Sequence, residues 1–173
     1  MSRYYLSLGS NINRYQNITA ALDALSDHYG KLEISPVYES AAVGFAGDPF
    51  LNNVVAIDSD RGLPAVAAEL KQIEADNGRL RDREKFSGRT LDIDILTCDG
   101  LVGLHAGITL PREEILYNAY VLKPLADIAG ERCHPVVGVS YRQLWSDYDC
   151  AKQPLRAVPF RWHDRQLPTP ETL

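Results

Sequence analysis

Two aspartates separated by one residue, Asp92 and Asp94, are the clearest sign of chemistry in this sequence. They lie in the stretch Leu-Asp-Ile-Asp-Ile-Leu, whose alternation of apolar and acidic residues is typical of a β-strand. Residues two apart on a strand point to the same face, so the two carboxylates are expected side by side. Because like charges on one surface repel each other, the spacing predicts a divalent cation between them. The alternative is a pair of carboxylates on an exposed sheet face.

A cluster of basic residues directly precedes this strand. It consists of Arg79, Arg81, Arg83, Lys85 and Arg89. Guanidinium groups bind phosphate oxygens through two parallel hydrogen bonds. Magnesium prefers one or two carboxylates completed by water and phosphate oxygens. The two aspartates and the basic cluster together therefore predict a site for a polyphosphate. A pair of metal ions could share the two aspartates there.

A third feature is an aromatic ring and an amide on one expected strand, 50–58. Phe50 and Asn52 are two residues apart and share a face. A ring beside a buried amide suits a flat heterocycle with donor and acceptor edges. Alone the pattern is weak, since Phe50 could belong to the core and Asn52 could bond local backbone. Phe86 is a further aromatic in the basic loop.

The elements that must position these residues follow from periodicity and from glycine and proline. We expect strands at 4–8, 32–39, 50–58 and 91–96, and helices at 14–28, from Pro64 to Gly78, and at 112–128. Pro36 interrupts the second strand, which indicates an edge or a bulge. The order βαββαβ predicts an α+β fold, a ferredoxin-like antiparallel sheet with helices packed on its faces.

The chain has 173 residues, which favours one domain. We expect that domain to span residues 1–150. Residues 151–173 carry four prolines and a local excess of basic residues, and little periodicity. This segment is expected to be a Pro-rich basic C-terminal tail that lies over the surface.

Composition limits the partners and the compartment. The net charge of −5 argues against a nucleic-acid or membrane-surface role. No signal peptide and no apolar run long enough to cross a membrane are expected. The three cysteines form no CxxC pair, so we expect reduced thiols in a cytoplasmic protein. We also expect a monomer.

Several motifs together resemble one known family. They are Leu-Gly-Ser-Asn at 8–11, Ser-Pro-Val-Tyr-Glu-Ser at 35–40, Phe-Leu-Asn-Asn-Val-Val at 50–55, Gly-Arg-Leu-Arg at 78–81, Arg-Thr-Leu-Asp-Ile-Asp-Ile-Leu at 89–96, and Tyr-Val-Leu-Lys-Pro-Leu-Ala-Asp-Ile at 120–128. In order and spacing they resemble the 6-hydroxymethyl-7,8-dihydropterin pyrophosphokinases of folate biosynthesis. The segment 89–94 is the most specific match.

The resemblance implies a transferase that moves the pyrophosphoryl group of ATP onto the hydroxymethyl group of the reduced pterin and releases AMP. The implied partners are ATP, the pterin and two Mg²⁺ ions. Two other readings remain open. One is a divergent paralogue with altered nucleotide use, and the other is a pterin-binding module without enzymatic activity.

The resemblance also implies roles for individual residues. Asp92 and Asp94 would bind the metal ions, and Arg79 and Arg89 would stabilise charge on the phosphates in transfer. The implied pterin site consists of Ser40, Val43, Phe50, Asn52 and Tyr120. The implied ATP site consists of Glu74, Arg81, Lys85, Phe86, Thr109 and Arg112.

The segment after Pro111 departs from the family pattern. Many members have a histidine next and a basic residue a few positions on, whereas this chain reads Arg-Glu-Glu-Ile-Leu-Tyr-Asn over 112–118. Arg112 could replace the histidine as a phosphate contact. Glu113 and Glu114 would repel phosphate unless they point away. The departure predicts weaker ATP binding than is typical of the family, or an altered pose of the nucleotide.

Overall fold

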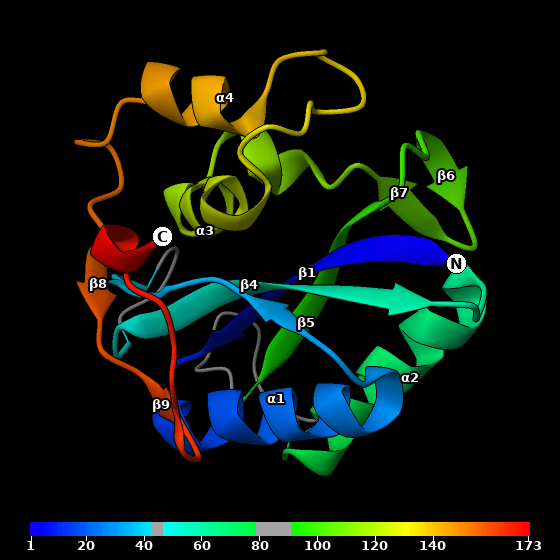
Figure 1. The fold of residues 1–173 in the computed structure, drawn as a ribbon, viewed down its shortest axis with the longest axis horizontal. Helices are drawn as coiled ribbons and strands as arrows, with labels where there is room; N and C mark the ends of the chain where they lie inside the picture. Colours follow the sequence, from blue (N-terminus) through cyan, green and yellow to red (C-terminus); the bar gives the residue numbers. More distant parts are fainter. Residues whose placement is uncertain (43–46, 79–90) are drawn as a thin grey trace.

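An antiparallel sheet forms the centre of the molecule (Figure 1). The computed structural model describes residues 1–42, 47–78 and 91–173. The strands of the sheet are β1 (Ser2–Ser10), β2 (Glu33–Ile34), β3 (Val37–Ser40), β4 (Phe50–Ser59), β5 (Asp92–Cys98) and β8 (Arg156–Val158). Their order is β5-β1-β4-β3-β8, with β2 also paired to β4. Without β8 this is the ferredoxin-like order, so the predicted α+β fold is confirmed.

Helices cover both faces of the sheet. On one side lie α1 (Arg14–Tyr29) and α2 (Leu63–Asp76), drawn below the sheet in Figure 1. On the other side lies α3 (Ala119–Ala129), with α4 (Tyr141–Asp147) packed on it. The bounds of α1 and α2 agree closely with the ranges expected from apolar spacing, because each helix buries a face with a regular period.

Side chains that alternate along the strands pack into two separate hydrophobic cores, one on each face of the sheet. Leu6 and Leu8 of β1 pack with Leu22 of α1 on one side. Tyr5 of β1 and Val54 of β4 pack with α3 on the other. Successive side chains of a strand point to opposite faces, so each central strand contributes to both cores. Parity identifies which side chains of a strand share a face, except where a register shift interrupts the pairing of β1 with β5.

Pro36 interrupts the second strand as expected, and the strand is divided into β2 and β3. Proline has no N–H to donate to a ladder. At the break the hydroxyl of Ser35 accepts a hydrogen bond from the N–H of Val54 at 2.8 Å, and the N–H of Ser35 donates to the carbonyl of Val54 at 2.9 Å. Both β2 and β3 therefore stay aligned on β4.

The prediction of one helix over 112–128 is wrong in one respect, because the helical region is interrupted near its start. A 3₁₀ turn, η1 (Glu113–Leu116), is followed by extended backbone at Asn118 (φ −107°, ψ 116°) before α3 begins. Ile115, Ala119 and Leu122 are all buried, at a spacing that also fits a continuous helix. Apolar periodicity therefore could not reveal the break.

The structure also contains elements that periodicity did not predict. They are α4, the hairpin of β6 (Gly103–His105) and β7 (Ile108–Leu110), the pair β9 (Arg161–Trp162) and β10 (Arg165–Gln166), and η2 (Pro170–Thr172). Most are too short for a period to be read from sequence. Within the described ranges, no helix is both long enough and apolar enough to cross a membrane.

The C-terminal segment does more than lie over the surface, which corrects that expectation. Its strand β8 pairs with β3 and extends the sheet at that edge. Three of its side chains, Val158, Phe160 and Leu167, are buried in the core on the α1 side. Proline and charge dominate its composition and hide these few apolar anchors. The domain boundary at residue 150 stays a prediction.

Candidate functional site

The two aspartates lie on one face of β5, as the alternation predicted. Asp92 and Asp94 are partly exposed, whereas Leu91, Ile93 and Ile95 are buried. Ile93 and Ile95 belong to the core that contains α1 and α2. Parity therefore places both carboxylates on the face that carries α3. Both aspartates lie in the first half of β5, and neither belongs to the apolar core on the α3 side.

Strand pairing brings the aspartates and the predicted pterin residue into one row. Gly9 of β1 pairs with Asp92 on one side and with Asn52 on the other. Directly paired residues of an antiparallel sheet point to the same face, so Asn52 and Asp92 share a surface. Two strand spacings separate their backbones, roughly 10 Å. The amide of Asn52 and the carboxylate of Asp92 thus lie on the two sides of Gly9.

Glycine at position 9 leaves the room that Asn52 occupies. A Cβ atom placed on Gly9 would lie 2.8 Å from Nδ2 of Asn52 and 3.9 Å from the ring of Phe50. Asn52 is buried, and its Oδ1 accepts a hydrogen bond from the hydroxyl of Ser40 at 3.1 Å. Three of the predicted pterin residues, Ser40, Phe50 and Asn52, are therefore brought together at this end of the sheet.

Tyr120, also predicted to contact the pterin, lies in the first turn of α3. Its hydroxyl contacts Nδ2 of Asn118 at 2.9 Å and Oε2 of Glu114 at 3.4 Å. Burial raises the pKa of the Tyr120 phenol, and the nearby carboxylate of Glu114 raises it further. The phenol is therefore protonated at neutral pH and can act as a hydrogen-bond donor.

Arg112 joins the aspartate strand to the altered segment. Its guanidinium lies 3.6 Å from Oδ2 of Asp94 and donates through Nε to Oε1 of Glu114 at 2.8 Å. Burial acts to lower the pKa of Arg112, but Asp94 and Glu114 outweigh it, so that pKa is raised. Glu114 is thus paired with Arg112, whereas Glu113 is exposed.

A cavity of about 510 Å³ lies beside Arg112. Thr109 and Arg112, both predicted to contact ATP, line it together with Glu113, Glu114 and Tyr117. The described structure thus brings these two predicted ATP residues together. The carboxylates give the cavity a mixed charge.

Glu74, a third residue predicted to contact ATP, is buried on α2. Its Oε2 accepts a hydrogen bond from the N–H of Ile93 at 2.9 Å. The strand β5 is at the edge of the sheet, where N–H groups would otherwise lack a protein partner. Glu74 therefore anchors α2 to the aspartate strand, between the two aspartates.

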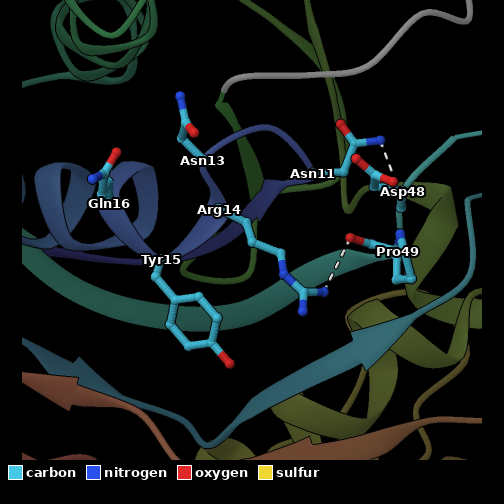
Figure 2. Close-up of a pocket in the computed structure, with 7 residues that line it drawn as sticks. All are labelled: Asn11, Asn13, Arg14, Tyr15, Gln16, Asp48 and Pro49. Carbon is cyan, nitrogen blue, oxygen red and sulfur yellow. Dashed lines mark hydrogen bonds between the residues drawn. The ribbon is translucent and has the colours of Figure 1, made fainter.

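A second cavity, of about 520 Å³, lies at the start of α1 and is lined by none of the predicted site residues (Figure 2). Its polar side chains hold the segment that leads into β4. Nδ2 of Asn11 donates to the carbonyl of Asp48 at 3.1 Å, and Arg14 donates to the carbonyl of Pro49 at 3.2 Å. These contacts fix the approach to Phe50.

Six predicted site residues lie outside the described residues. They are Val43, Arg79, Arg81, Lys85, Phe86 and Arg89. Their roles stay predictions. Within the described ranges, no three His, Cys, Asp or Glu residues cluster as a metal site, so protein ligands beyond Asp92 and Asp94 are not apparent there. A pair of carboxylates still fits Mg²⁺, whose remaining ligands are commonly water and phosphate.

Two features of the structure near this site have no clear signal in the sequence. Gly9 occurs in the motif Leu-Gly-Ser-Asn, which alone carries little information, and its pairing with Asp92 and Asn52 depends on sheet order. The hydrogen bonds of Gln153 with Asn118 and Ala119 have no sequence signal either, because more than thirty residues separate Gln153 from both partners.

Comparisons with known proteins agree on the family and the fold. A model of the family described as "7,8-dihydro-6-hydroxymethylpterin-pyrophosphokinase (HPPK)" matches residues 5–130. The protein of Pseudomonas aeruginosa named "2-amino-4-hydroxy-6-hydroxymethyldihydropteridine pyrophosphokinase" is 35% identical over 133 residues, which covers 75% of this chain and 82% of that protein.

One of the other relatives is much longer than this chain. "Folic acid synthesis protein fol1" of Pneumocystis carinii is 34% identical over 169 residues, covering 94% of this chain but 22% of that protein. Among solved structures, wild-type Plasmodium falciparum HPPK-DHPS with pteroate superimposes with a TM-score of 0.67 at 13% identity, covering 85% of this chain and 42% of that one. At that identity the match shows the fold alone.

Proposed function

Because the chain belongs to the 7,8-dihydro-6-hydroxymethylpterin-pyrophosphokinase family, we propose that it transfers the pyrophosphoryl group of ATP onto 6-hydroxymethyl-7,8-dihydropterin in folate biosynthesis. The hydroxymethyl oxygen forms a bond to the β-phosphorus and loses its proton. The bond from the β-phosphorus to the oxygen shared with the α-phosphorus breaks. AMP leaves with that oxygen.

The observation that carries this proposal is the row Asp92–Gly9–Asn52. The amide of Asn52 is the proposed reader of the pterin edge, with Ser40 holding that amide and Phe50 and Tyr120 beside the ring. A bicyclic pterin spans much of the distance between Asn52 and Asp92. Its hydroxymethyl group would then lie next to the aspartates. Transfer of this kind depends on positioning and charge neutralisation rather than on a covalent nucleophile.

The aspartate pair is the proposed magnesium site. Asp92 and Asp94 lie on one partly exposed face, and Mg²⁺ accepts such a donor set when phosphate oxygens complete it. When bound, two ions would neutralise charge on the phosphates of ATP. Arg79 and Arg89 are the proposed catalytic arginines, and Val43 is a proposed pterin contact.

The nucleotide half is proposed to use Thr109 and Arg112, with Glu74, Arg81, Lys85 and Phe86 along the ATP cleft. The exposed carboxylate of Glu113 lines the same cavity as Arg112 and would repel the phosphates of ATP. This supports the prediction of weaker ATP binding than is typical of the family. Calorimetry with a non-hydrolysable ATP analogue tests it, and an affinity equal to that of the Pseudomonas aeruginosa relative would refute it.

The activity itself is tested by product analysis. Purified protein with ATP, the reduced pterin and Mg²⁺ should release AMP, and omission of either the pterin or the metal should abolish AMP release. ADP or inorganic phosphate as the product would instead indicate a divergent paralogue. Pterin binding without any turnover would indicate a binding module. The monomeric state and cytoplasmic location stay predictions.

A further inference from the structure

The start of α3 is held by a residue from the segment after α4. Oε1 of Gln153 accepts a hydrogen bond from the N–H of Ala119 at 2.9 Å. Its Nε2 donates to Oδ1 of Asn118, also at 2.9 Å. Gln153 lies beyond residues 5–130, the range that matches the family model. Close by, the hydroxyl of Tyr148 donates to the carbonyl of Tyr117 at 2.9 Å.

Gln153 satisfies one of the N–H groups at the start of α3 that have no partner within the helix. The first N–H groups of a helix have no partner within the helix, and asparagine at the N-cap usually supplies one. Here Asn118 is the N-cap residue, yet its side chain makes no cap hydrogen bond. Gln153 accepts from the N–H of Ala119, and the side-chain amide of Asn118 bonds to Gln153 and to Glu114 rather than to the first turn of the helix.

The side-chain amide of Asn118 begins a series of polar contacts that ends at Asp94 on β5. Nδ2 of Asn118 donates to Oε2 of Glu114 at 2.8 Å. The other oxygen of Glu114 accepts from Nε of Arg112 at 2.8 Å. The guanidinium of Arg112 lies 3.6 Å from Asp94. Each donor in this series faces an acceptor. Rotating the amide of Asn118 by half a turn would therefore place its oxygen against the carboxylate of Glu114 and remove that hydrogen bond.

We propose that Gln153 is a positioning residue for the nucleotide half of the site: it fixes the amide of Asn118 so that Glu114 holds Arg112 beside Asp94. The inference rests on the proposed function, which assigns Arg112 to the phosphates of ATP. It adds a residue from outside the family-matched range to the determinants of ATP binding. The competing explanation is that Gln153 only caps α3.

The substitution Gln153→Glu separates the two explanations. A carboxylate still accepts from the N–H of Ala119, and negative charge is favourable at a helix N-terminus, so α3 remains capped. Glutamate cannot donate to Oδ1 of Asn118, so that amide must rotate and present its oxygen to Glu114. We expect about tenfold weaker binding of a non-hydrolysable ATP analogue, the effect of one hydrogen bond to a charged group. The melting temperature should not fall.

A compensating substitution supplies the rescue. In the double variant Gln153→Glu/Glu114→Gln, the rotated amide of Asn118 meets a donor at position 114. The oxygen of that glutamine can still accept from Arg112. The double variant should therefore recover most of the lost affinity, a coupling that independent sites do not show.

Gln16→Glu provides the matched control, because it makes the same chemical change on exposed Gln16 of α1. It should not change the affinity and, since negative charge is favourable in the first turn of α1, it should not lower the melting temperature. Wild-type affinity in Gln153→Glu, an affinity loss accompanied by a fall in melting temperature, or no recovery in the double variant would each overturn the positioning role. Absence of AMP from the wild-type protein would refute the proposed function instead, since the affinity measurements do not require turnover.

Discussion

Gly9 determines what Asn52 can do at this site. The amide of Asn52 occupies the space above Gly9 and is held by Ser40 from the neighbouring strand. An amide that is buried and fixed in this way presents its remaining hydrogen-bonding capacity in one direction. Discrimination between heterocycles by hydrogen bonding depends on such fixed groups, because a mismatched ligand leaves them without a partner.

Gly9→Ala is therefore expected to weaken pterin binding. Its Cβ would lie 2.8 Å from Nδ2 of Asn52, closer than side chains tolerate, so the amide must move. We expect about tenfold weaker binding of the reduced pterin by calorimetry, the effect of one misplaced hydrogen bond. Gly100→Ala is the control, since nothing lies within 4 Å of its added Cβ. Unchanged pterin affinity in Gly9→Ala would show that Asn52 does not read the pterin.

Asp94→Asn tests the metal site at the same scale. Loss of one carboxylate removes charge that would hold Mg²⁺ against the phosphates. AMP release should fall on the order of 10²–10³-fold, as is usual when one group that stabilises transition-state charge is lost. Pterin affinity should stay unchanged, because Asn52 is two strands away. Asp60→Asn, at an 81% exposed carboxylate, is the control. Retained AMP release in Asp94→Asn would contradict the metal assignment.

At the scale of elements, ion pairs link the strand β3 to the helix α1 and to the strand β8. Glu39 of β3 forms ion pairs with Arg14 of α1 at 2.6 Å and with Arg156 of β8 at 2.8 Å. Hydrogen bonds from Arg156 and then from Arg14 lower the pKa of Glu39. One carboxylate thus joins a helix, a sheet strand and the C-terminal strand.

This arrangement predicts an acid-dependent contribution to stability. The folded pKa of Glu39 is below its usual value of 4.5, so its contribution is fully present above pH 4.5 and is lost as the pH falls through the folded pKa. Glu39→Gln should lower the melting temperature at neutral pH, and its difference from the wild type should shrink below pH 4.5. Thermal scans over a pH series measure this.

The control for that series is Glu131→Gln, which breaks an ion pair with Arg142 whose side chains are 78% and 72% exposed. Such exposed pairs contribute little, so its pH profile should follow the wild type. A constant difference between Glu39→Gln and the wild type across the acid range would disprove the role of Glu39.

At the scale of the whole molecule, the C-terminal segment belongs to the folded unit. Phe160 is 3% exposed and its ring stacks on Tyr15 of α1, with centroids 5.6 Å apart. The indole N–H of Trp162 donates to Asp23 of α1 at 2.9 Å. Together with β8, these contacts attach the last part of the chain to the sheet and to α1.

Phe160→Ala should accordingly destabilise the entire protein. Removing a buried phenylalanine costs about 3–5 kcal/mol in lost burial and cavity formation. Urea denaturation should show this as a lower midpoint with a similar slope. Leu104→Ala, at a side chain that is 71% exposed, should change stability by no more than about 0.5 kcal/mol. A free energy of unfolding close to wild type for Phe160→Ala would mean that the segment folds separately.

The sequence by itself determined the elements with a long period and the residues placed on them. Strand alternation put Asp92 with Asp94 and Phe50 with Asn52 on shared faces, and the order of elements predicted the sheet. Tertiary structure alone decided the break before α3, the addition of β8 to the sheet, and the contacts of Gln153. These features depend on hydrogen bonds between residues far apart in the chain, which local periodicity does not encode. Sheet order likewise decided that Gly9 lies between Asn52 and Asp92, because strand neighbours are set by packing rather than by sequence proximity.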